Sequence, residues 1–119
     1  MKRSQLLEIV EVLTGLKDQK LPVKLAYRVT RILEKCTREQ TFFEGERVKL
    51  IRSLGVEKEN GQIEVTDVNR ETFVEKINTL LDEEVHVQLP MLPLELFPDS
   101  IVISTQEMSK LACLIEEPM

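Results

Sequence analysis

The strongest pattern in the chain is a row of mostly apolar positions that recurs at alternating three- and four-residue spacing between Pro22 and Leu54. This alternation is typical of a coiled-coil seam, and it continues for four heptads with a single glycine, Gly45, along the way. It predicts one helix from Pro22 to about Leu54 whose seam packs on another helix or on a second copy. The predicted seam comprises Ala26, Val29, Leu33, Cys36, Gln40, Phe43, Arg47, Leu50 and Leu54.

A helix of this length would extend roughly 50 Å at about 1.5 Å per residue, more than a short leading helix can cover. We therefore expect either the C-terminal half of the chain or another copy to pack on it. The two polar seam positions, Gln40 and Arg47, are typical of residues that set register or oligomer number. The alternative is a break at Gly45, which stands between two glutamates and would divide the segment into two shorter helices.

The flanking segments predict further short elements. Apolar positions from Leu6 to Leu13 share one face of a leading helix, with Ser4 as its N-cap and Gly15 at its end. Asn60-Gly61 between short alternating stretches predicts a hairpin. A third helix follows, capped by Asp67 or Asn69 and ending near Asp82, with an apolar face of Phe73, Val74, Ile77, Leu80 and Leu81.

The C-terminal part contains two predicted strands separated by a proline-rich segment, residues 89–98, which we call the strap. Val85, Val87 and Leu89 predict a half-buried strand, and residues 101–103 predict another. Between them, residues 89–98 hold three prolines and cannot form a helix or a central strand. This strap is either buried, within the fold or a homo-oligomer, or exposed as a docking strip. Its candidate apolar residues are Leu92, Leu94, Leu96 and Phe97.

A capping box, Ser104 to Glu107, opens a final helix. Together these elements predict an α+β fold in one domain, residues 1–119. Residues 1–55 would form a long helical hairpin or coiled-coil-like rod. Residues 56–119 would form a small antiparallel sheet with two further helices, packed on the rod. With 119 residues, 42% hydrophobic and 31% charged, the chain has the length and balance of one folded domain.

Charge is unevenly distributed along the chain. Residues 1–60 hold 13 basic and 9 acidic side chains, whereas residues 61–119 hold 3 basic and 12 acidic ones. The two halves can attract each other, other copies or different partners. A basic stripe on the long helix, spaced four and three, comprises Lys24, Arg28, Arg31, Lys35 and Arg38. It could lie along phosphates, but only Tyr27 is an aromatic neighbour, so nucleic acid is the less favoured partner.

Catalytic and metal-binding constellations are not evident. The single histidine, His86, shares its strand face with Glu84 and Gln88, which is too few ligands for a metal site. Cys36 lies on the predicted seam and Cys113 stands beside Ala112 and Leu114, so both are expected to be buried as small hydrophobic residues. The acidic run Asp82–Glu84 is expected to be a solvated turn. The sequence therefore predicts no catalytic residue, no metal, no cofactor and no enzyme activity.

Membrane insertion is not expected either. No apolar run reaches the roughly 20 residues of a spanning helix. Glu8 and Glu11 interrupt the apolar part of the N-terminal segment, so it does not read as a signal peptide.

Three phrases of the sequence together resemble a known family. They are Lys20-Leu-Pro-Val-Lys-Leu-Ala-Tyr-Arg-Val29, Leu80-Leu-Asp-Glu-Glu-Val85 and Ile103-Ser-Thr-Gln-Glu-Met108, with the Asn60-Gly61 turn between the first two. Over nearly its whole length the chain resembles small uncharacterised proteins of tailed phages and prophages of Gram-positive hosts. The resemblance implies a phage setting, and thus the host cell cytoplasm, but it transfers no catalytic motif.

These observations lead to three functional hypotheses. The first is a non-enzymatic, homo-oligomeric protein-binding factor that occupies a host protein, in counter-defence or host takeover. The second is a phage structural or assembly component, such as a connector, a tail accessory protein or an assembly chaperone. The third and least favoured is a nucleic-acid-binding regulator that uses the basic stripe.

Overall fold

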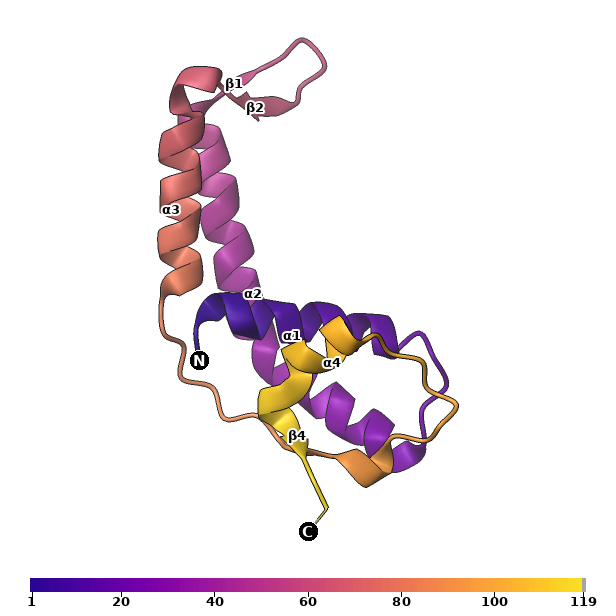
Figure 1. Cartoon of the computed structure of the whole chain (residues 1–119). Helices are drawn as coiled ribbons and strands as arrows, with labels where there is room; N and C mark the ends of the chain where they lie inside the picture. The colour runs from indigo at the N-terminus through magenta and orange to yellow at the C-terminus, as the bar shows by residue number, and fades with distance from the viewer. Residues whose placement is uncertain (119) are drawn as a thin grey trace.

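The computed structural model describes residues 1–118 and has an α+β fold with two parts, a base and an arm (Figure 1). We call residues 1–36 and 83–118 the base and residues 37–82 the arm. The molecule measures 54 × 30 × 24 Å, with a radius of gyration of 17.6 Å. A compact chain of this length would have a radius of gyration of about 13–14 Å. The difference arises because the arm projects from the base.

A single long helix, α2 (Val23–Leu54), connects the two parts. The prediction of one helix over this stretch is confirmed, and the alternative break at Gly45 does not occur. α2 bends where it leaves the base (Figure 1). The Thr37 hydroxyl, at the beginning of the arm, donates to the carbonyl of Leu33 at 3.0 Å, a contact that often bends helices.

The core of the base is built around α1 (Arg3–Leu16). Leu6, Ile9 and Leu13 are fully buried on this helix, as their spacing predicts. The predicted ends were slightly wrong. The helix begins at Arg3, where the Lys2 amide donates to Gln5 Oε1 at 2.8 Å, and it continues through Gly15 to Leu16.

α1 and the first half of α2 diverge as a V, and the C-terminal helix α4 (Thr105–Leu111) lies across one face of this V (Figure 1). Its predicted capping box is present, with the Glu107 amide donating to Ser104 Oγ at 3.0 Å and the Ser104 amide donating to Glu107 Oε1 at 3.1 Å. A 3₁₀ turn, η3 (Ala112–Leu114), continues it. Leu111 and Leu114 are buried and close the core from this side.

The arm pairs the second half of α2 with α3 (Arg70–Asp82), and a hairpin caps its tip (Figure 1). Strand β1 (Gly55–Glu57) pairs antiparallel with β2 (Ile63–Val65). Gly61 has φ 82°, which its missing Cβ allows. The Asn60-Gly61 hairpin and the third helix are thus confirmed, and a 3₁₀ turn, η1 (Asp67–Asn69), leads into that helix.

The predicted sheet of the C-terminal part was wrong in extent and direction. Residues 101–103 form no strand, and residues 84–89 contribute only one bridge, between Glu84 and Lys2. The further pair consists of β3 (Leu92–Pro93) and β4 (Ile115–Glu116), and it is parallel. A 3₁₀ turn, η2 (Leu94–Leu96), follows β3. Alternation places Val85 inward against the core, and its amide donates to the Met1 carbonyl at 2.9 Å. The pairing ends there because the N-terminal segment enters α1 at Arg3, and the prolines further along the segment lack amide donors.

A buried arginine joins the arm to the base. Nη1 of Arg3 donates to the Leu80 carbonyl at 2.6 Å and lies 3.1 Å from Glu83 Oε1, both at the end of α3. Its Nη2 lies 3.3 Å from Glu39 Oε2 on α2. The side chain also stacks over the Phe42 ring, 4.9 Å from its centroid.

The acidic run Asp82–Glu84 is exposed, as expected, but its carboxylates also make ion pairs that the sequence did not predict. Lys2 Nζ lies 3.7 Å from Asp82, and the Met1 amino group lies 3.2 Å from Glu84. Together with the Arg3–Glu83 contact, each of the three carboxylates faces a cation at the N-terminal end of the base. Here the basic and acidic halves of the chain attract each other.

Candidate helix-binding groove

The predicted seam of α2 divides into two rows in the base. The buried row is Leu25, Val29, Ile32 and Cys36. Three predicted seam residues lie on the neighbouring row, where Ala26 and Leu33 are half-buried and Gln40 is exposed. Within the chain these three positions are therefore not part of the buried row, and their role as a seam between copies stays a prediction. Apolar residues are consecutive at 25–26 and at 32–33, so the three- and four-residue spacing can be drawn through either row. Leu25 and Ile32 share one buried cluster with Leu6, Ile9 and Leu13 of α1.

In the arm the predicted seam faces α3 only in part. Phe43, Leu50 and Leu54 are half-buried. Arg47 makes its ion pair within α2, where its Nη2 lies 2.6 Å from Glu44 Oε1. The hydrogen bond from Arg47 lowers the pKa of the exposed Glu44 carboxyl. Among the described residues Arg47 forms no ion pair between helices, so nothing assigns it a register role.

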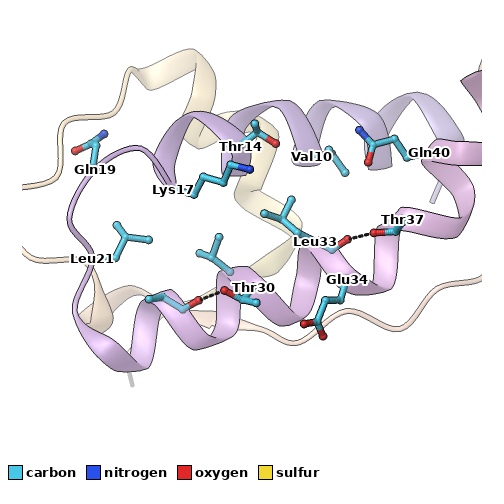
Figure 2. A pocket seen from close by; sticks show the side chains of 12 residues that line it. Val10, Thr14, Lys17, Gln19, Leu21, Thr30, Leu33, Glu34, Thr37 and Gln40 are labelled. Atoms are coloured by element: carbon cyan, nitrogen blue, oxygen red, sulfur yellow. Dashed lines mark hydrogen bonds between the residues drawn. The ribbon is translucent and has the colours of Figure 1, made fainter.

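The uncovered row opens into a groove between α1 and α2, with a volume of about 630 Å³ (Figure 2). α4 lies behind it, so the groove is open on the side of the V opposite α4. Its apolar lining residues are Val10, Leu21, Ala26, Val29 and Leu33. Its polar lining residues are Thr14, Lys17, Gln19, Thr30, Glu34, Thr37 and Gln40.

The α2 side of this groove carries its own heptad stripe. Ala26, Thr30, Leu33, Thr37 and Gln40 are spaced four, three, four and three. The hydroxyls of Thr30 and Thr37 donate to carbonyls within the helix, at 2.8 and 3.0 Å. Those donors are therefore satisfied before any partner binds. A stripe with this spacing on an open groove is suited to an amphipathic helix.

The basic stripe is only partly a free helix face. Lys24, Arg28 and Arg31 line a second groove against the strap, while Lys35 and Arg38 lie further along α2 and are exposed. Nη1 of Arg28 donates to the Met91 carbonyl at 2.8 Å. This contact ties the strap to α2, and no feature of the sequence pattern predicted it.

The strap itself is mostly packed into the base. Leu92 is fully buried, and Leu96 and Phe97 are half-buried against the core, whereas Leu94 is 39% exposed. The strap therefore contributes to the core and also presents an apolar edge beside the basic stripe.

The side chains that could serve as nucleophiles, acids, bases or metal ligands do not form a cluster among residues 1–118. His86 is exposed, and no three His, Cys, Asp or Glu side chains within residues 1–118 are grouped as metal ligands. Cys36 is buried, and burial raises the pKa of its thiol from 9.0 to about 11. Cys113 was expected to be buried, but it lies exposed on η3. The one-sided burial of that short turn, with Leu114 inward, leaves Cys113 outside.

No helix within residues 1–118 combines the length and apolar character needed to cross a membrane. Comparisons with protein-family models, with curated proteins and with solved structures find no match for this chain.

Proposed function

We propose that this protein is a non-enzymatic protein-binding factor that pairs with a second copy of itself through the groove between α1 and α2. The observation that carries the proposal is the heptad stripe of Ala26, Leu33 and their neighbours, which no other segment of the described chain covers. Helices with such stripes gain stability by packing on another helix.

A second copy suits the groove because the charges in its lining are of opposite sign. Lys17 stands at the end of α1 and Glu34 on α2. A two-fold axis parallel to the helices sets α1 of one copy against α2 of the other, which brings unlike charges onto facing helices. The small side chains of Ala26 and Thr30 allow the helices to approach closely. The product is a four-helix bundle with the arms left free.

The partner beyond the second copy is, in this proposal, a host protein, bound in the cytoplasm of a phage-infected or lysogenic cell. The setting comes from the sequence resemblance to small phage and prophage proteins. Among the described residues the potential nucleophiles, acids, bases and metal ligands are not grouped, which supports a role in binding rather than in catalysis. Occupying a host protein would serve counter-defence or host takeover.

One observation favours a second candidate, a component of phage structure or assembly. Between Cys36 and Val85 no residue is buried, although the arm carries Phe43, Leu50 and Phe73. A projecting two-helix hairpin with a half-exposed interior is suited to insertion between other subunits.

Purification of the tagged protein from infected or lysogenic bacteria, after nuclease treatment, separates the two candidates. A stoichiometric host enzyme identified by mass spectrometry supports the binding factor. Capsid, portal or tail proteins in its place support the assembly component. A protein that purifies alone, with the mass of one chain at micromolar concentration, contradicts both the host partner and the pairing of copies.

A further inference from the structure

A second groove lies on the base, between the first turns of α2 and the strap, with a volume of about 640 Å³. It shares no residue with the groove between α1 and α2. From α2 it is lined by Val23, Lys24, Tyr27, Arg28 and Arg31, and from the strap by Pro90, Pro93, Glu95 and Leu96. Its size is within the range of about 300–1,000 Å³ found for ligand-binding clefts.

Large apolar side chains are exposed along this groove. Val23 is 85% exposed and Tyr27 is 65% exposed. The adjacent strap adds Met91 and Leu94, which are about two-fifths exposed. An exposed apolar cluster rimmed by charge is typical of a protein-interaction site. Tyrosine is also enriched where interfaces concentrate their binding energy.

The charges of the groove favour an anionic occupant. Three cations, Lys24, Arg28 and Arg31, face one carboxylate, that of Glu95. The hydrogen bond from Arg28 to the Met91 carbonyl holds that guanidinium at the groove, so little side-chain freedom is lost on binding. Within residues 1–118 the only ion pair of Arg31 is with the exposed Glu34, at 3.3 Å, and exposed pairs of this kind are easily exchanged.

We infer that this groove binds an acidic segment of a partner protein that carries a large apolar side chain. The apolar side chain packs on Tyr27 and the proline rings, and the flanking carboxylates pair with Lys24, Arg28 and Arg31. The inference rests on the proposed function only in that the partner is a protein. It does not depend on the pairing of copies through the other groove.

Nucleic acid fits the same surface less well. Single-stranded nucleic acids bind successive aromatic platforms within a cationic channel, whereas this groove offers one aromatic ring. The carboxylate of Glu95 would repel phosphates, and the chain carries a net charge of −5. An acidic peptide uses the apolar walls of the groove, which phosphates cannot.

Selection of random peptides displayed on phage against the purified protein tests this inference. We expect the enriched peptides to contain Asp or Glu beside Leu, Ile, Phe or Trp. Fluorescence anisotropy of the most enriched peptide should then show about tenfold or greater loss of affinity in the double variant Lys24→Glu/Arg31→Glu. The variant Tyr27→Ala should lose a comparable factor. These side chains are exposed or at the groove rim, and thermal melting verifies that the fold is kept.

The matched control is Lys35→Glu/Arg38→Glu, which makes the same charge change on the same helix outside the groove. Its affinity should stay within about twofold of the unchanged protein, apart from weak long-range effects. Equal losses in both double variants would show attraction by net charge alone and overturn the inference. Selection that enriches no peptide, or only peptides without acidic residues, would also overturn it.

Two further outcomes identify other occupants. Binding of oligothymidylate or oligouridylate that Lys24→Glu/Arg31→Glu abolishes would make the groove a nucleic-acid surface. A fall in the solution mass of the same variant would show that a second copy fills the groove. The inferred acidic peptide predicts neither result. The groove between α1 and α2 contains none of these residues. A failure of the proposed pairing of copies would therefore be seen separately, because the unchanged protein would have the mass of one chain.

Discussion

Arg3 of α1 and Glu39 of α2 form an ion pair, with Nη2 and Oε2 3.3 Å apart, at the point where the arm leaves the base. The arginine side chain is only 6% exposed and that of the glutamate 25% exposed. The same guanidinium reaches the Leu80 carbonyl and Glu83. One residue of α1 thus contacts both helices of the arm, which makes it the main polar link between the two parts.

We expect Arg3→Met to lower the free energy of unfolding by about 1–3 kcal/mol, because it leaves the Leu80 carbonyl and two carboxylates without their donor. Denaturant unfolding followed by circular dichroism measures the loss. A double-mutant cycle with Glu39→Gln should show a coupling energy of about 0.5–1.5 kcal/mol. Additive effects of the two changes would mean that the ion pair does not stabilise the junction.

Gly45 tests the continuity of α2. It is helical and exposed, and a Cβ added there would meet nothing within 4 Å. Gly45→Ala should therefore stabilise the protein by about 0.5–1 kcal/mol, because alanine favours the helix and restricts the unfolded chain. Denaturant unfolding provides the measurement. A destabilised variant would indicate a non-helical backbone at this residue.

Gly55 provides the contrasting control at the tip of the arm. Its added Cβ would lie 2.5 Å from the Ile51 carbonyl oxygen and 2.7 Å from Ile63 Cγ2. Gly55→Ala should cost about 1–3 kcal/mol, because backbone and strand must move apart.

The two cysteines should differ in reactivity. Cys113 is exposed, whereas burial raises the pKa of the Cys36 thiol to about 11, and only the thiolate is an effective nucleophile. At pH 8 iodoacetamide should modify one thiol of the folded chain and both thiols in denaturant, as counted by mass spectrometry. Modification of both at equal rates in the folded protein would contradict the burial of Cys36.

The raised pKa also fixes the sign of a pH effect. The folded state holds the Cys36 proton more tightly than the unfolded chain. The stability from this group is therefore complete below pH 9 and is lost as the pH rises from 9.0 towards 11. Cys36→Ala should remove this part of the alkaline destabilisation while leaving the remainder.

Much of the fold follows from local signals in the sequence. The long helix, the Asn60-Gly61 hairpin and the Ser104–Glu107 capping box are encoded by residues close together in the chain. Each also satisfies its own backbone hydrogen bonds, so distant partners are not needed to predict it. The apolar face of α1 was visible for the same reason, since its spacing matches the helical repeat.

What the sequence could not show are relations between distant residues. At residues 25–26 and 32–33 two apolar residues follow one another, and the spacing alone does not decide which of each pair is buried. That depends on the direction from which α1 packs against α2. The contacts of Arg3 with Leu80 and Glu83 join residues 77 and 80 positions apart, and no periodicity reports such a pairing. The alternation at Val85, Val87 and Leu89 correctly signals one buried side, but the identity of the covering element lies elsewhere in the chain.

Neighbouring residues on α2 distinguish the core from the groove. Ile32 is fully buried, whereas Leu33 is half-buried and lines the groove. Ile32→Asp should unfold the protein, at a cost of more than about 4 kcal/mol, because it buries an unpaired charge. Leu33→Asp should keep the fold, as judged by circular dichroism and melting, and lose only the pairing of copies. If both variants unfold alike, Leu33 belongs to the core, and the claim that its row lines an open groove is wrong.

The central claim is that the groove between α1 and α2 pairs two copies, and the solution mass tests it most directly. Light scattering coupled to gel filtration should give twice the chain mass of 13.8 kDa for the unchanged protein at micromolar concentration. It should give the mass of one chain for Thr37→Arg, which places a long charged side chain in the groove. Thr79→Arg is the matched control, since Thr79 is an exposed helical threonine on α3 with the same hydroxyl-to-carbonyl bond, and it should keep the double mass. A single-chain mass for the unchanged protein, or the double mass for Thr37→Arg, would contradict the account.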